Sequence, residues 1–252
     1  MTATGKIMHG TALLDGASGR IGSPNPVVEM RLHFDGYDES SGRIEGRDAA
    51  GDQLFSMDIR KLLGSVPCFT ANSQIATGQG MIPVSALTPG TRVITRDNGM
   101  QELLWVGRRR FGWQALGLNP LLRPVRISAG ALGQGLPERD MVVSPNHRFL
   151  TRMPGEGEAA ERLTMARDLV GLYGIACDAA IEVEYWQLLF ARHELVLADG
   201  SWSESFLPTQ ASLAALDSEG RAALSLALPG IETEVITGFD SVRPFAEIGS
   251  AA

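Results

Sequence analysis

The amino-acid sequence predicts an all-β fold. Short runs in which apolar and polar residues alternate recur along most of the chain, as at residues 91–95, and such alternation is typical of strands with one buried face. Asp97–Asn98–Gly99 follows that run, and Asn-Gly between two alternating runs is a strong hairpin signal. Before residue 208, only residues 159–169 have the spacing of a good helix.

Residues 1–66 are expected to form a small β-rich N-terminal region. Residues 27–34 and 42–47 alternate in polarity, and the segment between them, residues 35–42, is rich in Asp, Gly and Ser. Turn-forming residues between two alternating runs favour hairpins or a small meander.

Residues 67–207 contain the densest strand pattern. The run at residues 91–95 is predicted to continue, across the Asn98–Gly99 turn, into residues 102–107. Further strands are expected at residues 124–128, 141–144, 148–151, 182–190 and 194–197. A short turn is expected at residues 84–87, and the helix at 159–169 places Leu163, Ala166 and Leu169 on one face.

Residues 208–252 differ in texture and are expected to form a partly helical C-terminal tail. Residues 209–228 are rich in Ala and Leu and are interrupted at residues 217–220, which predicts one or two short helices. Residues 231–252 are expected to pack back onto the body of the protein or to fray.

Composition restricts the partners and the compartment. The chain has 252 residues, 44% of them hydrophobic, and a net charge of −7, which permits a buried core and disfavours a nucleic-acid binder. No apolar run is long enough to span a membrane, and residues 1–10 lack the apolar core of a signal peptide. We therefore expect synthesis in the cytoplasm; leaderless secretion would leave no mark in the sequence.

A cysteine and two histidines are the candidates for chemistry. Cys68 opens a β-rich segment, His147 lies three residues after Ser144, and His193 lies between two expected strands. A thiol becomes a nucleophile when a neighbour lowers its pKa or takes its proton. These residue types alone fit a cysteine hydrolase, a zinc site or coincidence. Cys177 adjoins an apolar run and is expected to be buried, as cysteines usually are.

The order of several short blocks adds a family resemblance. The blocks lie at residues 68–70, 75–77, 83–84, 95–99, 105–109, 130–133, 136–140, 143–148, 190–194 and 198–205. With them, residues 67–207 resemble the Hint domain, the Hedgehog/intein autoprocessing module, and most closely its short bacterial form.

The resemblance implies a horseshoe of β-hairpins and a self-processing reaction. The Cys68 thiolate attacks the carbonyl carbon of Pro67, which is an N-to-S acyl shift. His147 protonates the Cys68 nitrogen, Ser144 orients the amide or the imidazole, and His193 assists later proton transfers. Water or a small nucleophile then opens the thioester. The substrate is the chain's own N-terminal segment, and no external cofactor or metal is expected.

The sequence departs from the family at two places. An intein ends with His-Asn, whereas the corresponding positions here are Glu204 and Ser205, followed by Phe206. Hedgehog-type modules place an aspartate where this chain has residues 105–107, without a carboxylate. We therefore expect no full splicing and no sterol transfer. Pro67 also crowds the carbonyl that is to be attacked.

Three alternatives remain open from the sequence. In the first alternative, the domain is a degenerate, non-cleaving Hint scaffold that serves as a binding or structural module of an exported or surface protein. Alternatively, Cys68 and His147 form the dyad of a hydrolase that acts on other molecules. A zinc site of Cys68, His147 and His193 is the weakest alternative, because the three lack the spacing of a zinc motif.

Overall fold

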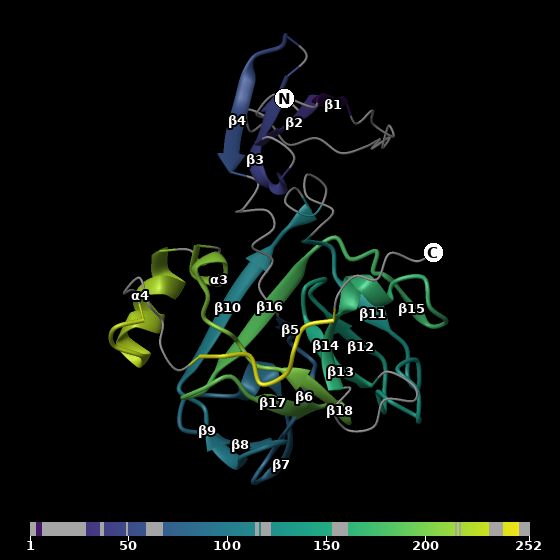
Figure 1. The fold of residues 1–252 in the computed structure, drawn as a ribbon, viewed down its shortest axis with the longest axis vertical. Helices are drawn as coiled ribbons and strands as arrows, with labels where there is room; N and C mark the ends of the chain where they lie inside the picture. The colour runs from purple at the N-terminus through teal and green to yellow at the C-terminus, as the bar shows by residue number, and fades with distance from the viewer. Residues whose placement is uncertain are drawn as a thin grey trace, which may run out of the picture. The chain divides into compact units, whose positions relative to one another are not determined.

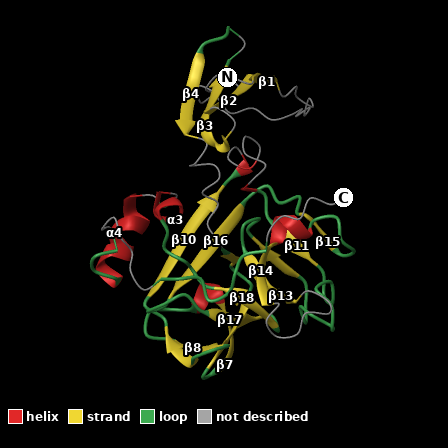
Figure 2. Cartoon of the chain, viewed as in Figure 1, coloured by secondary structure: helices red, strands yellow, loops and turns green. Residues whose placement is uncertain are grey.

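The computed structural model describes most of the chain. The described residues are 4–6, 29–35, 38–48, 50–58, 68–113, 116, 122–152, 161–214, 216, 218–231 and 239–246. The chain divides into two compact units, Met1–Leu63 and Gly64–Ala252, and each is considered by itself. Strands dominate both units (Figure 2), as the sequence predicts.

The first unit contains an antiparallel sheet. Within the described residues its strands follow the order β1 (Thr4–Lys6), β2 (Glu29–Asp35), β3 (Asp38–Arg47) and β4 (Gln53–Asp58). The turn expected over residues 35–42 is shorter than predicted, because Asp35 already pairs with Asp38. Polar residues of β3 thus belong to the strand, since backbone pairing with β2 and β4 outweighs their preference for turns.

The second unit contains a six-stranded antiparallel sheet among its described residues (Figure 1). Its order is β10 (Trp105–Phe111), β16 (Val183–Leu189), β5 (Phe69–Thr70), β12 (Met141–Val143), β11 (Val125–Ile127) and β15 (Ile175–Cys177). The prediction that Cys177 is buried was wrong, because β15 is an edge strand and leaves this side chain exposed.

An eight-stranded antiparallel sheet completes the described part of this unit. Its order is β14 (Glu161–Met165), β13 (Arg148–Arg152), β18 (Ser201–Glu204), β17 (Leu195–Ala198), β6 (Gln74–Thr77), β8 (Arg92–Thr95) and β9 (Gly99–Glu102), with β7 (Gly80–Pro83) paired to β6. The expected turn at residues 84–87 is the 3₁₀ helix η1 (Val84–Ala86).

The Asn98–Gly99 turn joins a hairpin, but its second strand differs from the prediction. Strand β8 pairs with β9, and Thr95 lies opposite Gly99. The chain then leaves this sheet, and β10 begins at Trp105 beside β16. The run at residues 102–107 therefore crosses between two sheets. Sequence alternation does not reveal such a crossing, because it does not specify the partner strand of each segment.

The helix predicted at residues 159–169 is wrong where the structure describes it. Glu161–Met165 form β14, and Ala166–Leu169 form the 3₁₀ helix η4. Strand β14 pairs along its whole length with β13, with Leu150 opposite Leu163. Leu163 is 1% exposed, so burial within a sheet overrides a helical pattern that has few apolar residues.

The tail forms the two short helices that its composition predicts. These are α3 (Gln210–Ala214) and α4 (Ser218–Ala227). Helix α4 packs against β10 (Figure 2). Its residue Leu224 is fully buried. Among the described helices, none combines the length and the apolar character that a bilayer crossing requires.

Residues 239–246, here called the strap, return to the body of the unit as predicted. The Leu163 N–H donates to the Pro244 carbonyl at 3.0 Å, and the Ala246 N–H donates to the Leu163 carbonyl at 3.0 Å. Phe245 therefore forms a parallel bridge with Leu163. The strap is the yellow segment of Figure 1, and these bonds hold it along β14.

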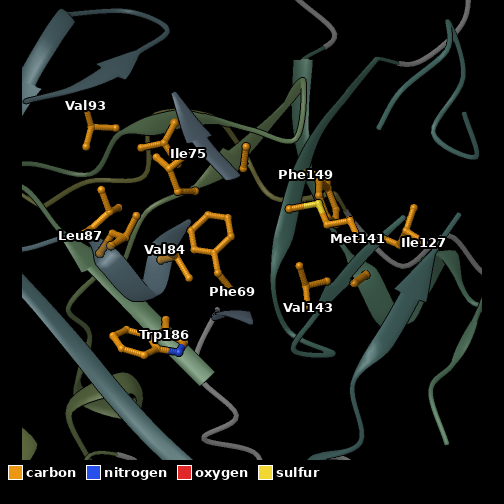
Figure 3. Close-up of a cluster of buried hydrophobic side chains, with 14 of the residues drawn as sticks. Phe69, Ile75, Val84, Leu87, Val93, Ile127, Met141, Val143, Phe149 and Trp186 are labelled. Atoms are coloured by element: carbon orange, nitrogen blue, oxygen red, sulfur yellow. The ribbon is translucent and has the colours of Figure 1, made fainter. Parts of the chain in front are cut away.

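Two apolar clusters form the core of the second unit. The first includes Phe69, Ile75, Val84, Met141 and Phe149 and joins residues of both sheets (Figure 3). The second contains Cys68, Trp105, Phe206 and Leu224, so it joins the start of β5 to α4. Cys68 therefore lies within packed apolar side chains.

Candidate functional site

Strand β5 brings the candidate nucleophile between two partner strands. Phe69 lies opposite Val143 of β12 on one side and opposite Trp186 of β16 on the other. The residues that follow in these antiparallel registers are Ser144 and Gln187, and both reach Cys68. Sheet register thus unites residues that lie far apart in the sequence.

The backbone of Cys68 is held by Ser144 in both directions. The Cys68 N–H donates to Ser144 Oγ at 2.9 Å. The Ser144 N–H donates to the Cys68 carbonyl oxygen at 3.0 Å. Both residues are buried. The nitrogen of the bond that precedes Cys68 therefore points at a hydroxyl group.

The Cys68 thiol is kept in its neutral form. Its side chain is buried, and burial raises the pKa of the thiol to about 12, while the hydrogen bond from Gln187 opposes that rise. Gln187 Nε2 donates to Cys68 Sγ at 3.4 Å. The thiolate form of Cys68 is therefore disfavoured at neutral pH.

His147 follows Ser144 by three residues, and its ring lies within an apolar cage. The backbone N–H of His147 donates to the Ser144 carbonyl oxygen at 3.0 Å, and this bond closes the turn between β12 and β13. Its ring packs edge-on against Phe69, with 4.5 Å between ring centroids, and against Phe149. Neither ring nitrogen has a hydrogen-bond partner among the described residues. Burial, and then the charge of Arg148, lower the pKa of His147 to about 3, so the ring is neutral.

His193 lies just before β17 and has different partners. Its side chain is fully buried, and its Nδ1 accepts a hydrogen bond of 3.3 Å from the Val242 N–H of the strap. Its Nε2 lies 3.8 Å from Glu204 Oε2. Burial, and then the charge of Arg148, lower the pKa of His193 to about 4.

Glu204 and Arg148 form a buried ion pair beside His193. Arg148 Nη1 donates to both Glu204 carboxylate oxygens, at 3.2 and 3.1 Å. The Glu204 side chain is fully buried, and burial raises its pKa to about 7 although Arg148 opposes that rise. The carboxyl group is therefore able to exchange a proton near neutral pH.

The predicted site residues thus fall into two groups. The cysteine half-site contains Cys68, Ser144, Gln187 and His147. The histidine half-site contains His193, Glu204 and Arg148. The two influence each other, because the charge of Glu204 adds to the rise in the pKa of Cys68.

Sequence reasoning missed Gln187, Arg148 and the role of Glu204. Gln187 is a polar residue within an otherwise apolar part of β16, and Glu204 is a carboxylate at the buried end of β18. An uncompensated polar residue in a buried strand was the available signal. Arg148 gave no such signal, because an arginine at the start of a strand is common at surfaces.

Two expectations lie at the limits of the description. Pro67, on the other side of the candidate scissile bond, lies outside the described residues. In the part of the chain that the structure describes, no three His, Cys, Asp or Glu side chains are arranged to hold a metal ion.

Comparison with protein families gives a match that spans both half-sites. Residues 67–210 match the sequence model of the Hint domain, which is more than half of the chain. A comparison with curated proteins found no match.

Solved structures of inteins and of an intein-like domain are similar to part of this chain. A bacterial intein-like domain from Clostridium thermocellum is 12% identical, with a TM-score of 0.34; the match covers 56% of this chain and 99% of that one. A DnaB intein from Synechocystis sp. PCC 6803 is 12% identical, with a TM-score of 0.33, over 55% and 97%. The gp41-1 intein is 16% identical, with a TM-score of 0.32, over 54% and 96%.

Proposed function

Because the chain belongs to the Hint domain family, whose fold is of the autoprocessing type, we propose that Cys68 cleaves the peptide bond that precedes it. The observation that carries the proposal is the pair of hydrogen bonds between Cys68 and Ser144. They fix the leaving nitrogen and the nucleophile's own backbone, and a held geometry of this kind favours an intramolecular attack.

The first step is an N-to-S acyl shift. Cys68 Sγ forms a bond to the carbonyl carbon of Pro67, and the bond from that carbon to the Cys68 nitrogen breaks. The thiol proton is lost and the nitrogen gains one, so the step is balanced by a proton transfer. Ser144 Oγ, which accepts from the Cys68 N–H at 2.9 Å, orients the nitrogen for that transfer.

His147 is the residue that we assign to the proton transfer. Its ring is neutral at pH 7, and neither ring nitrogen has a hydrogen-bond partner among the described residues, so we assign to it the proton that the Cys68 nitrogen gains. Its turn with Ser144 and its contact with Phe69 support this assignment. Gln187 assists by donating to the sulfur as negative charge develops.

The second step is hydrolysis of the thioester. Water attacks the carbonyl carbon, the bond from carbon to sulfur breaks, and the Cys68 sulfur regains its proton. A small nucleophile in place of water would attack the same carbonyl carbon and would become attached to the end of residues 1–67. His193 and Glu204 are assigned to this step, because the Glu204 carboxyl has a pKa of about 7 and lies 3.8 Å from the ring. Ser205 cannot cyclise as an asparagine does, so the reaction stops before splicing.

The proposal also assigns roles to the parts of the chain. Residues 1–66 form the β-rich part, which is released together with Pro67; residues 67–207 form the Hint domain, and residues 208–252 form the tail. The compact unit that begins at Gly64 and the family match from residue 67 support a boundary near the proposed cut.

Intact mass spectrometry of freshly purified full chain tests the proposal. We expect two fragments that divide between Pro67 and Cys68, with faster release when dithiothreitol or hydroxylamine is added. The variant Cys68→Ala is expected to stay intact, whereas Cys177→Ala, which removes the exposed cysteine, is expected to cleave like the parent. A single intact mass for the parent under every condition would refute the proposal.

A matched pair of serine variants tests the observation that carries the proposal. Ser144→Ala removes the acceptor of the Cys68 N–H, and we expect cleavage to slow by roughly 10- to 100-fold. Ser203→Ala removes a hydroxyl that is equally buried and has no hydrogen-bond partner among the described residues, and its cleavage rate is expected to match that of the parent. Equal rates for both variants would contradict the assignment of Ser144.

The second candidate function is a non-cleaving Hint scaffold for binding. The burial of Cys68 and its pKa of about 12 favour this function, because both oppose formation of a thiolate. In that case the parent stays intact and its Cys68 resists alkylation until the protein unfolds. Both results together would favour the scaffold over self-cleavage.

A further inference from the structure

We infer that the strap is a positioning segment for His193: it fixes the ring proton on Nε2 and closes the histidine half-site against water. The strap lies outside the residues that match the Hint family, 67–210, so this contribution is an addition to the family's fold. Its use in catalysis rests on the proposed function, whereas its effect on His193 does not.

The strap is anchored independently of His193. Leu163 of β14 makes backbone hydrogen bonds with Pro244 and Ala246, on both sides of Phe245. Arg243 adds side-chain bonds to Glu161 Oε2 at 2.9 Å and to Asp97 Oδ1 at 2.8 Å. Backbone pairing and two carboxylates from separate elements therefore set the position of the strap before any contact with the ring is considered.

Glu161 gives this anchor a charged centre. It is 5% exposed and pairs with Arg96, Arg152 and Arg243. Burial works against its charge, but the hydrogen bonds from Arg243 and Arg152 hold its pKa below the usual value. The carboxylate thus stays ionised and retains Arg243 down to mildly acidic pH.

The hydrogen bond from Val242 determines where the proton of His193 resides. A nitrogen that accepts a hydrogen bond from a backbone N–H must present a lone pair, so Nδ1 is unprotonated. In the neutral ring the proton is therefore on Nε2, which faces Glu204 Oε2 at 3.8 Å. A doubly protonated ring has no lone pair for Val242, so protonation of His193 and seating of the strap exclude each other.

Phe245 closes the other side of the same half-site. Its ring lies 4.3 Å from the Arg148 guanidinium carbon, and Phe245 is itself 42% exposed. It therefore covers one side of the Arg148 guanidinium group, whose side chain is 15% exposed. Among the described residues, the charged groups that act on His193 are Glu204 from β18 and Arg148 from β13. Cation–π contact with Phe245 favours this closed arrangement.

Histidine side-chain NMR on the full chain tests the inference without any cleavage. In a Cys68→Ala background, the parent is expected to show His193 as the Nε2–H tautomer, with protonation only near its pKa of about 4. Val242→Pro removes the N–H donor, and we expect the pKa of His193 to rise by about one unit or more and Nδ1–H to appear. Val242→Ala keeps the N–H and is the matched control, with the tautomer and pKa of the parent.

A second pair of variants keeps the test decisive if the proline variant fails to fold. Arg243→Gln removes the charged anchor and is expected to raise the pKa of His193, and Arg243→Lys is expected to restore the parent value in part. Unchanged tautomer and pKa of His193 in Arg243→Gln and in any folded Val242→Pro protein would overturn the inference.

Cleavage assays with Cys68 intact separate this inference from the proposed function. If the parent cleaves, Val242→Pro is expected to change the pH profile of thioester opening while hydroxylamine-trapped thioester forms at the parent rate. Equal slowing of both steps, with His193 titrating as in the parent, would reduce the strap to a structural element and overturn the inference. If the parent never cleaves, the proposed function fails, and the NMR result alone decides whether the strap sets the state of His193.

Discussion

The cysteine half-site and the histidine half-site are equally buried but are built differently. Cys68 is held by residues from the strands on either side of β5, and its partners are neutral. His193 is held by a backbone N–H from the strap and faces the ion pair of Glu204 with Arg148. One half-site therefore depends on sheet register and the other on charge and on a segment near the end of the chain.

This difference indicates where each half-site is sensitive. Neutral hydrogen bonds in a central strand are disturbed by changes in packing, because every atom there has close neighbours. A buried charge pair is disturbed by the loss of one partner, which leaves the other charge uncompensated. The following variants exploit this contrast, in order of expected effect.

The largest effect is expected for Arg148→Met in the histidine half-site. This change leaves the fully buried Glu204 without its cation, and we expect a loss of about 3–5 kcal/mol in the free energy of unfolding. Urea denaturation monitored by tryptophan fluorescence measures it. Arg110→Met, which breaks the exposed pair with Glu182, is the control and should leave stability unchanged. Similar losses in the free energy of unfolding for both variants would show that burial does not distinguish the Arg148–Glu204 ion pair from the Arg110–Glu182 ion pair.

A smaller effect is expected for Gly107→Ala, which acts on the cysteine half-site. A Cβ at Gly107 would lie 2.0 Å from a ring carbon of Trp105 and 2.6 Å from Gln187 Oε1. Relief of these clashes moves Gln187 away from Cys68 Sγ, so we expect a loss of about 1–3 kcal/mol in stability and slower cleavage. Gly112→Ala meets no atom within 4 Å and should change stability by less than about 0.5 kcal/mol. Equal effects of both variants would contradict the role assigned to Gln187.

The smallest effect, measured over a single pH unit, is a pH dependence carried by His147. Burial lowers its pKa from 6.5 to about 3, so the unfolded chain binds a proton between these values and the folded chain does not. The contribution of His147 to the free energy of unfolding is therefore fully present above pH 6.5. It falls by about 1.4 kcal/mol for each pH unit below that value. His147→Phe, which suits the contacts with Phe69 and Phe149, should remove this share. Urea denaturation at about pH 5 and about pH 6 measures the change in the free energy of unfolding for the parent and for His147→Phe. The same change in both proteins would disprove the prediction.

Most of the strands could be predicted from the sequence, because alternation and turn residues act locally. The segment at residues 159–169 failed because β14 is stabilised by its pairing with β13, a partner that the local sequence does not specify. The run after Gly99 failed for a related reason, since nothing local indicates where a chain changes sheets.

The site was predicted less completely than the fold. Cys68, His147 and His193 carry reactive groups that made them candidates, and the resemblance to the Hint domain added Ser144 and assigned the roles. Gln187 becomes important only because the register of β5 with β16 sets it opposite Cys68. Val242 acts through its backbone N–H, which every residue except proline has, so no side-chain pattern could have indicated it.

The position of β5 has a consequence for what remains after a cut. Phe69 is the first residue of the second unit that joins a described strand ladder, so a break before Cys68 severs no ladder bond of that unit. Hydrolysis would therefore leave two molecules, each with the described strand pairing of its own unit. Their gain in translational and rotational freedom opposes religation, and the bond, once opened, would stay open without any further expenditure of chemical energy.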